Sequence, residues 1–184
     1  ESKNDFFYTH YKQGTLDIYE YLDFQLAPIA GRPREVIDAW HREFMQAKIR
    51  PIVHPGTPEL LARHGEDLRA IVTATNRFIT APIARELGVE HLIACEVEEL
   101  PDGRLTGRPR GTPSFREGKI ARVHEWLDTL GHRLGDFEET WFYSDSLNDL
   151  PLLEMVSHPV AVDPDPTLER IAGERGWPVM RLKA

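Results

Sequence analysis

The sequence contains a single cysteine, no long apolar run and no excess of basic residues, and each absence excludes a class of protein. Cys95 alone cannot form a disulfide framework within one chain. No apolar run approaches the roughly 18 residues that a membrane-spanning helix needs, and the sequence does not start with a basic-then-apolar leader. The formal net charge of -8 argues against a nucleic-acid-binding surface. We therefore expect a cytoplasmic protein with no membrane and no nucleic-acid partner.

The remaining composition is that of an ordinary globular protein. Of the 184 residues, 41% are hydrophobic and 28% are charged, which are typical fractions for such proteins. This length suffices for one well-buried domain or for a core with a small accessory domain. The eight histidines are scattered, and no pair has a zinc-like spacing near another ligand. A histidine metal site is therefore not expected.

Two styles of sequence meet near Pro55-Gly56. Before this point, aromatic and aliphatic residues at spacings of three and four predict successive packed helices. Thr15 is the expected N-cap of the second helix, and Pro33 suits the first turn of a third helix that runs to about residue 47.

After Gly56 the pattern alternates between strand and helix. Strands are expected at 68–73, 91–94, 96–100, 104–106, 140–143 and 159–162. Helices are expected at 150–155 and, most clearly, at 115–130. Asp102-Gly103 is a strong hairpin turn signal. The alternation predicts an α/β protein with a parallel sheet that helices cover on both faces.

Two carboxylates follow one of the predicted strands. The strand Trp141-Phe142-Tyr143 stops at Ser144-Asp145, and Asp149 comes four positions after Asp145. Ligands bind beyond the carboxyl ends of parallel strands, and two neighbouring carboxylates repel unless a hard cation such as Mg²⁺ lies between them. The alternative is a helix N-cap. The spacing alone does not decide between a metal site and a cap.

Two further segments have the chemistry of phosphate binding. The strand Ile71-Val72-Thr73 ends in a hydroxyl residue followed by Ala74, and such strand-to-helix turns present backbone amides to phosphate oxygens. Lys119, at the start of the predicted helix 115–130, carries the charge that phosphoryl transfer needs. The alternatives are a helix cap for Thr73 and an exposed lysine.

Together and in this order, the three elements resemble the second, third and fourth motifs of the haloacid dehalogenase-like superfamily. The Asp102-Gly103 hairpin and the segment 159–165 agree with its phosphoserine-phosphatase-like branch, in subfamily IB. The resemblance covers nearly all of residues 51–181. It implies a Rossmann-like core over residues 51–184 and a small all-helical cap over residues 1–50.

The resemblance also implies an activity and a role for each matched residue. The activity is Mg²⁺-dependent hydrolysis of a small phosphorylated metabolite, a phosphomonoester, through an aspartyl-phosphate intermediate. Thr73, Lys119 and the Ala74 amide bind the transferred phosphoryl group. Asp145 ligates Mg²⁺, Asp149 supports the metal and the catalysis, and Asn148 contacts the phosphate or orders the loop.

One motif of the superfamily has no counterpart before the predicted cap. This motif is an apolar strand that ends in Asp-x-Asp, whose first aspartate is the nucleophile. Asp163-Pro164-Asp165 is the only Asp-x-Asp in the sequence, but it follows the fourth motif and its prolines leave few free amides. We predict Asp165 as a helix cap with Pro166 at the first helical position, and we expect the missing strand just upstream of Glu1.

Two other functions compete with this one. A catalytically inactive binding or interaction protein is the main one. A nucleotide-binding P-loop at 111–119 is disfavoured, because six residues separate Gly111 from Gly118 and Ile120 follows the lysine. The substrate also stays open between phosphoserine, histidinol phosphate and other phosphomonoesters, as does assembly into a homodimer.

Overall fold

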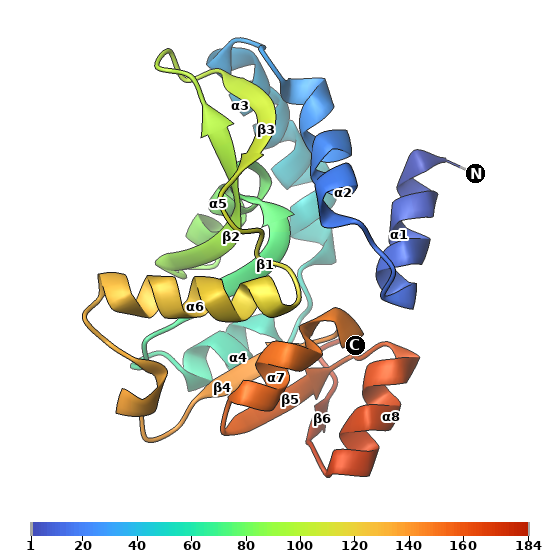
Figure 1. Cartoon of the computed structure of the whole chain (residues 1–184), viewed down its shortest axis with the longest axis vertical. Coiled ribbons are helices and arrows are strands. Elements are labelled where there is room, and N and C mark those ends of the chain that lie inside the picture. Colours follow the sequence, from blue (N-terminus) through green and yellow to red (C-terminus); the bar gives the residue numbers. More distant parts are fainter. Residues whose placement is uncertain (1, 184) are drawn as a thin grey trace. The chain divides into compact units, whose positions relative to one another are not determined.

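A computed structural model describes residues 2–183, whose contacts divide into two compact units (Figure 1). The first unit joins the start of the chain, as far as Leu16, to the residues from Phe115 onward. The second unit spans Asp17–Ser114. This division follows the density of contacts, and the helical cap over residues 1–50 stays a prediction.

The second unit is built on a three-stranded sheet. Its strands, in spatial order, are β1 (Ala70–Asn76), β2 (His91–Glu99) and β3 (Leu105–Arg110). β1 and β2 are parallel, and β2 and β3 are antiparallel. The helices of this unit are α2 (Ile18–Leu26), α3 (Arg34–Phe44), α4 (Thr57–Arg63) and α5 (Arg77–Glu86).

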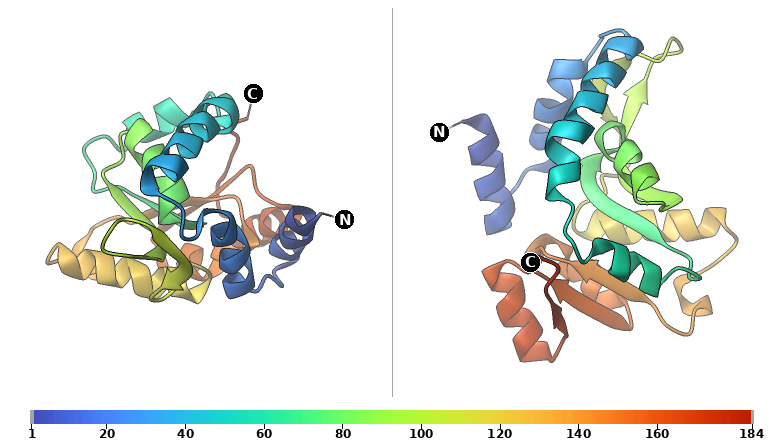
Figure 2. Two further views of the ribbon diagram at one scale, coloured as in Figure 1. Left: turned by 90° about the horizontal axis from the view of Figure 1, so that it is seen from above. Right: turned by 180° about the vertical axis from the view of Figure 1, so that it is seen from behind.

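α5 connects β1 to β2 and packs on both strands (Figure 2). It begins at Asn76, whose side-chain oxygen accepts a hydrogen bond from the Ile79 amide at 3.1 Å. The Thr80 hydroxyl also donates to the Asn76 carbonyl at 3.0 Å. Asn76 is fully buried, so these contacts fix the turn from the end of β1 into the helix.

The helices before β1 differ in detail from their predicted bounds. The second helix begins at Ile18, because Asp17 rather than Thr15 caps it by accepting from the Tyr19 amide at 2.9 Å. The third helix leaves α geometry after Phe44 and continues as a π-helix over Met45–Ile49. The predicted single helix to residue 47 therefore changes its winding at Met45.

The packing of these helices explains one glycine of the hairpin. α2 and the 3-10 turn η1 (Ala27–Ile29) lie against β3. Gly107, on β3, has φ +88, and a Cβ placed on it would lie 2.7 Å from the Cβ of Ala30. The close approach of the turn to the strand therefore requires glycine at this position.

The first unit is a second three-stranded sheet covered by helices. Its parallel strands, in spatial order, are β4 (Trp141–Ser144), β5 (His158–Val162) and β6 (Val179–Met180). The helices are α1 (Lys3–Gln13), α6 (Glu117–Thr129), α7 (Leu150–Met155) and α8 (Pro166–Arg175). Four buried side chains from α7, β5 and α8 form its core, namely Leu153, Ala161, Leu168 and Ala172.

The predicted fold class is confirmed: parallel strands alternate with helices that flank them. The Asp102-Gly103 hairpin is also present, between β2 and β3. Where two short strands were predicted, β2 is continuous. Its first half, His91–Cys95, pairs with β1, and its second half, Glu96–Glu99, pairs with β3. β2 is therefore shared by the parallel pairing with β1 and the antiparallel pairing with β3.

Each sheet has its first strand at an edge. Among the described residues, β1 pairs only with β2, and β4 pairs only with β5. No residue of β1 is buried except Asn76 at its end. A run such as Ala70-Ile71-Val72, which has the composition of a central strand, thus lies at an edge that offers backbone groups for a further ladder.

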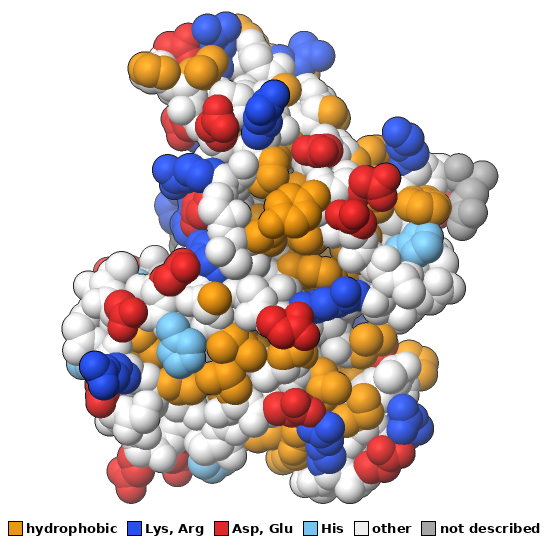
Figure 3. Space-filling view, viewed as in Figure 1, with side chains coloured by type: hydrophobic (Ala, Val, Ile, Leu, Met, Phe, Trp, Pro, Cys, Tyr) orange, Lys and Arg blue, Asp and Glu red, His pale blue; other side chains and the backbone are white. Residues whose placement is uncertain are grey.

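The described surface mixes both signs of charge. On the face seen in Figure 3, acidic and basic side chains are interspersed and no large basic patch gathers. No helix formed by residues 2–183 is long and apolar enough to cross a membrane.

Candidate active site

The loop after β4 is held by serine hydroxyls. Ser144 ends the strand, and its Oγ accepts from the Ser146 amide at 3.2 Å. Ser146 then caps the 3-10 turn η5 (Leu147–Asp149), with its Oγ accepting from the Asn148 amide at 3.1 Å. Asp149 precedes α7 but makes no side-chain cap there. The helix-cap alternative is therefore wrong for both carboxylates, because a serine performs the capping and the carboxylates are left for other contacts.

Lys119 and Asp149 form a buried ion pair. The Lys119 Nζ lies 2.6 Å from Asp149 Oδ1, and the two residues are 4% and 7% exposed. The Ser144 hydroxyl donates to the other oxygen, Asp149 Oδ2, at 2.6 Å. Because a buried carboxylate is tolerated only when its lone pairs are satisfied, the three groups act as one unit. The alternative of an exposed lysine is wrong.

Asp145 differs from Asp149 in its surroundings. The residue is exposed, yet partial loss of hydration, followed by the negative charges of Asp149 and Asp165, raises the pKa of its carboxyl group. Like charges that raise a carboxyl pKa are relieved by a bound cation. Among the influences on this pKa, the positive charge of Lys183 is the weakest, so the loop presents one carboxylate whose charge is only weakly balanced.

The donor set fits Mg²⁺ better than a metal that needs a full protein cage. Among residues 2–183, no three His, Cys, Asp or Glu side chains are placed to hold a metal ion together. Mg²⁺ is commonly held by one or two carboxylates, with water and substrate phosphate completing its shell. Asp145 suits that pattern, whereas both oxygens of Asp149 already accept from Lys119 and Ser144.

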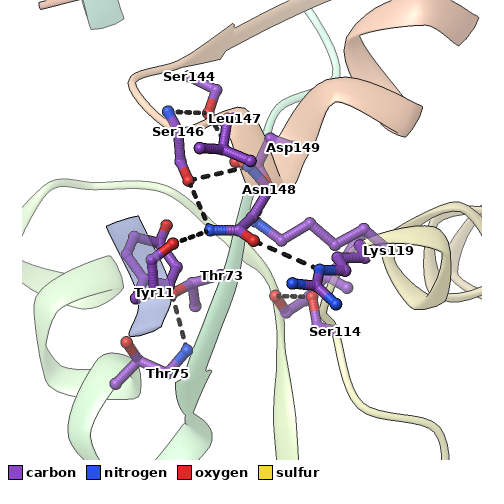
Figure 4. Close-up of polar contacts among 12 residues, drawn as sticks. Tyr11, Thr73, Thr75, Ser114, Lys119, Ser144, Ser146, Leu147, Asn148 and Asp149 are labelled. Carbon is purple, nitrogen blue, oxygen red and sulfur yellow. Dashed lines mark hydrogen bonds and ion pairs between the residues drawn. The ribbon is translucent and has the colours of Figure 1, made fainter. Parts of the chain in front are cut away.

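Asn148 is fixed by the C-terminal end of α1. Its Nδ2 donates to the Tyr11 carbonyl at 2.8 Å and to Ser146 Oγ at 3.2 Å, as Figure 4 shows. Its Oδ1 accepts from Arg116 Nε at 3.3 Å. The amide, 3% exposed, has partners on both sides, and these contacts support the loop-ordering role among the two roles predicted for it.

Two residues that sequence reasoning missed brace the same loop. Burial raises the pKa of the Tyr11 phenol to about 12, and this phenol is hydrogen-bonded to Ser146. Asp165 caps α8 as predicted, with Pro166 at its first turn. Asp165 also accepts a hydrogen bond from the Leu147 amide at 2.6 Å. The sequence did not indicate this contact, because Asp165 follows β5 and Leu147 follows β4.

Arg116 stands just before α6 in an unfavourable backbone conformation. Its φ of 50° and ψ of −127° lie in a region that favours glycine, at a cost of about 1–3 kcal/mol for other residues. Its guanidinium contacts Asn148 and the Gly14 carbonyl. Sequence reasoning assigned it no role.

Thr73 and Ala74 lie in the other unit, so their part in a common site stays a prediction. The Thr73 Oγ1 accepts from the Thr75 amide at 3.1 Å. Asn76 caps α5 instead of Thr73, so the cap alternative for Thr73 is wrong. Thr73 and Thr75 line a cavity of about 420 Å³, together with Tyr21, Gln25, Thr80 and the apolar side chains Phe44, Ile49, Ile71, Ile79 and Ile83.

Comparison with known proteins decides the family. The sequence model of the haloacid dehalogenase-like hydrolase family matches residues 3–154. The chain belongs to the haloacid dehalogenase-like hydrolase family. The resemblance seen in the sequence is therefore confirmed, and so is the predicted enzyme class, a phosphatase of this family that acts on small phosphorylated molecules.

Several members of the haloacid dehalogenase-like family are similar to this chain. A histidinol-phosphatase of Neisseria meningitidis is 44% identical over 185 residues, which cover all of this chain and 83% of that protein. The chain also matches phosphoserine phosphatase SerB1 of Mycobacterium tuberculosis, with 34% identity over 84% of this chain, and spans 49% of that relative.

Solved structures are similar to this chain in fold. A Bordetella pertussis Tohama I protein of unknown function has a TM-score of 0.90 at 49% identity, over 98% of this chain and 81% of that one. A substrate-bound phosphoserine phosphatase has a TM-score of 0.68 at 18% identity, over 98% and 80% of the two chains. At that identity the second likeness shows the shared fold alone.

Proposed function

We propose that this hydrolase cleaves a phosphomonoester in a Mg²⁺-dependent reaction that passes through an aspartyl-phosphate. The observation that carries the proposal is the buried Lys119–Asp149 pair, which lies beside the partly desolvated Asp145 carboxylate at the carboxyl end of β4. A buried lysine beside a carboxylate whose charge is only weakly balanced by Lys183 forms a site for a metal ion and a substrate that carries several negative oxygens.

Each side chain of the loop has a distinct part in this proposal. Lys119 places a fixed positive charge where phosphoryl oxygens bind, and Asp149 holds that lysine in position. Asp145 ligates Mg²⁺, which stabilises the charge on the phosphoryl oxygens when it is bound. Asn148 orders the loop between the two aspartates. Thr73 and the Ala74 amide hydrogen-bond the transferred group.

The nucleophile is supplied by a strand that this sequence does not contain. The first aspartate of that strand attacks phosphorus and the bond from phosphorus to the alcohol oxygen breaks, while the second aspartate of the motif protonates the leaving oxygen. The same second carboxylate then takes a proton from the water that attacks the aspartyl-phosphate, which releases inorganic phosphate and restores the first carboxylate. The edge of β1 supports this part of the proposal. That edge has an apolar sequence and, among the described residues, pairs with a strand on one side only.

Histidinol phosphate is the substrate that we propose. The Neisseria relative, 44% identical over the whole of this chain, is named for that activity. The cavity beside Thr73 also supports this choice over phosphoserine. No Lys or Arg is among the described residues that line it, and the carboxylate of phosphoserine needs a cationic partner when it is desolvated.

The test is a phosphatase assay on the protein that contains this chain, with histidinol phosphate, phosphoserine and other phosphomonoesters, in Mg²⁺ and in EDTA. Asp145→Asn should lower Mg²⁺-dependent turnover by about 100-fold or more, because it weakens the metal's hold. Asp128→Asn, an exposed change on α6 of the same unit, should leave turnover unchanged.

Three results count against parts of the proposal. Full activity in Asp145→Asn refutes the metal assignment. Preference for phosphoserine refutes the choice of substrate. A wild-type protein with no turnover on any phosphomonoester supports the catalytically inactive interaction protein instead.

A further inference from the structure

Arg116 joins three segments that are far apart in the sequence. It directly precedes α6, the helix that carries Lys119. Its Nε donates to Asn148 Oδ1 at 3.3 Å, and its terminal nitrogen donates to the Gly14 carbonyl at the end of α1. The guanidinium carbon also lies 4.8 Å from the centre of the Phe115 ring. A planar guanidinium can make these contacts at once, whereas a lysine ammonium acts as a single point charge.

The backbone of Arg116 shows that these contacts are strong enough to hold an unfavourable conformation. Among the described residues, only Arg116 and Asp163 have positive φ without being glycine. A conformation of this kind persists where the surrounding contacts over-determine it. Glycine adopts it without strain, so the side chain of Arg116 must offset the strain that its Cβ introduces.

The C-terminal end of α1 contacts both Arg116 and the loop 145–149. The carbonyls of Tyr11 and Gly14 accept from Asn148 and Arg116, and the carbonyl end of a helix favours such donors and positive charge. Gly14 has φ +71, and a Cβ on it would lie 3.0 Å from Leu147 Cδ1. Helix end, loop and guanidinium therefore form one contact set around Asn148, which lies between Asp145 and Asp149 in the sequence.

We propose that Arg116 is a positioning residue that fixes the loop 145–149 relative to Lys119. It touches none of the reacting groups assigned above. By holding Asn148, it sets where Asp145 stands with respect to the Lys119–Asp149 pair, and so it tunes how well the loop binds Mg²⁺. This inference rests on the proposed function for its catalytic readout, but its geometric part is independent of turnover.

The test compares Arg116→Gly and Arg116→Lys in the protein that contains this chain. Arg175→Gln is the matched control. Arg175 also lies over an aromatic ring, 5.0 Å from that of Trp177, and pairs with Glu154, away from the loop. The measurements are the half-saturating Mg²⁺ concentration for turnover, the substrate KM, the thermal midpoint and the exchange rate of the Asn148 side-chain amide by NMR.

The expected results distinguish an arginine that positions the loop from one that only stabilises the fold. Arg116→Gly should raise the half-saturating Mg²⁺ by about 10-fold or more, as loss of a group that orients a metal ligand does, with a smaller change in substrate KM. It should melt no lower than Arg116→Lys, because glycine removes the backbone strain that lysine keeps. The Asn148 amide should exchange faster in both variants and unchanged in Arg175→Gln.

Two results overturn the inference. One is a wild-type Mg²⁺ requirement and wild-type Asn148 exchange in both variants. The other is a Mg²⁺ requirement that follows the thermal midpoint across the variants, which indicates a purely structural arginine. If the wild-type protein turns over no phosphomonoester, the proposed function fails, and Asn148 exchange with Mg²⁺-induced shifts of the loop amides still decides the role of Arg116.

Discussion

Replacing Lys119 by methionine tests the buried ion pair on which the site depends. Methionine keeps most of the side-chain volume but removes the ammonium that lies 2.6 Å from Asp149 Oδ1. The Ser144 hydroxyl still donates to the other oxygen, yet a neutral hydroxyl does not compensate a charge that is 7% exposed. Removing one partner of a buried pair costs about 3–5 kcal/mol of unfolding free energy.

That loss is large enough to measure in two ways. For a protein of this size, 1 kcal/mol shifts the thermal midpoint by about 2–4 °C, so Lys119→Met should lower the midpoint by about 6–20 °C. Urea unfolding followed by tryptophan fluorescence gives the free energy directly. The slope with urea should stay constant, because a change in slope indicates a different unfolded or native state.

Two further variants identify the cause. The double change Lys119→Met with Asp149→Leu should recover most of the stability, because an apolar pair of similar volume often replaces a buried ion pair at little cost. Arg170→Met breaks an exposed pair with Glu174 on α8 and should cost less than about 0.5 kcal/mol. A Lys119→Met loss no larger than that of Arg170→Met would refute the buried-pair reasoning, as would a double variant less stable than the single one.

Three other changes have definite expected outcomes. Asp145→Asn should raise the thermal midpoint in EDTA, because the raised pKa means that folding disfavours the ionised carboxyl. Mg²⁺ should stabilise the wild type but not this variant, and equal stabilisation contradicts the assignment. Asn76→Ala should cost about 1–2 kcal/mol in urea unfolding, since it removes the cap that accepts from Ile79; a loss near zero contradicts the capping role. The amides of Leu182 and Lys183 lower the pKa of Asp163, so this contact stabilises above the unfolded pKa of about 4 and is lost as pH falls through the lower folded value. The protection of the Leu182 amide, measured as its exchange rate relative to that of an unfolded chain at the same pH, should fall with that titration. An Asp163→Asn variant that keeps the pH dependence disproves the cause.

Sequence patterns predicted helices and turns correctly where residues close together in the sequence determine them. α7 occupies the residues expected of it, and α8 begins where Asp165 and Pro166 indicated. The hairpin at Asp102-Gly103 needs only a turn of two residues. The continuity of β2 could not be predicted in the same way. Its alternation is the same on both sides of Cys95, and the change of partner strand depends on contacts made elsewhere in the chain.

The residue types of the candidate site could be predicted from the sequence. The hydrogen bonds that hold its loop in place could not. The order of Thr73, Lys119, Asp145 and Asp149 indicated a phosphoryl-transfer chemistry, although spacing alone left a cap or an exposed lysine open. The supports are long-range: the contact from Asn148 to Tyr11 spans 137 positions. Hydrogen bonds from a side chain to a distant carbonyl leave no pattern in the sequence, because any residue type supplies the carbonyl.

β1 and β4 lie at sheet edges on which no further strand of residues 2–183 pairs, and this has a practical consequence for anyone who prepares this chain by itself. Edges in natural sheets are blunted by lysine, proline or a bulge that turns the strand away. Neither Ala70–Asn76 nor Trp141–Ser144 contains a lysine or a proline, although the pairing of β1 with β2 shifts its register between Val72 and Asn76. The regular part of β1, residues 70–72, and the strand β4 thus offer a mostly apolar template on which another copy can dock and extend the ladder. Aggregation that rises with protein concentration, and that falls when a lysine is placed in the middle of β1, is the behaviour to expect during purification.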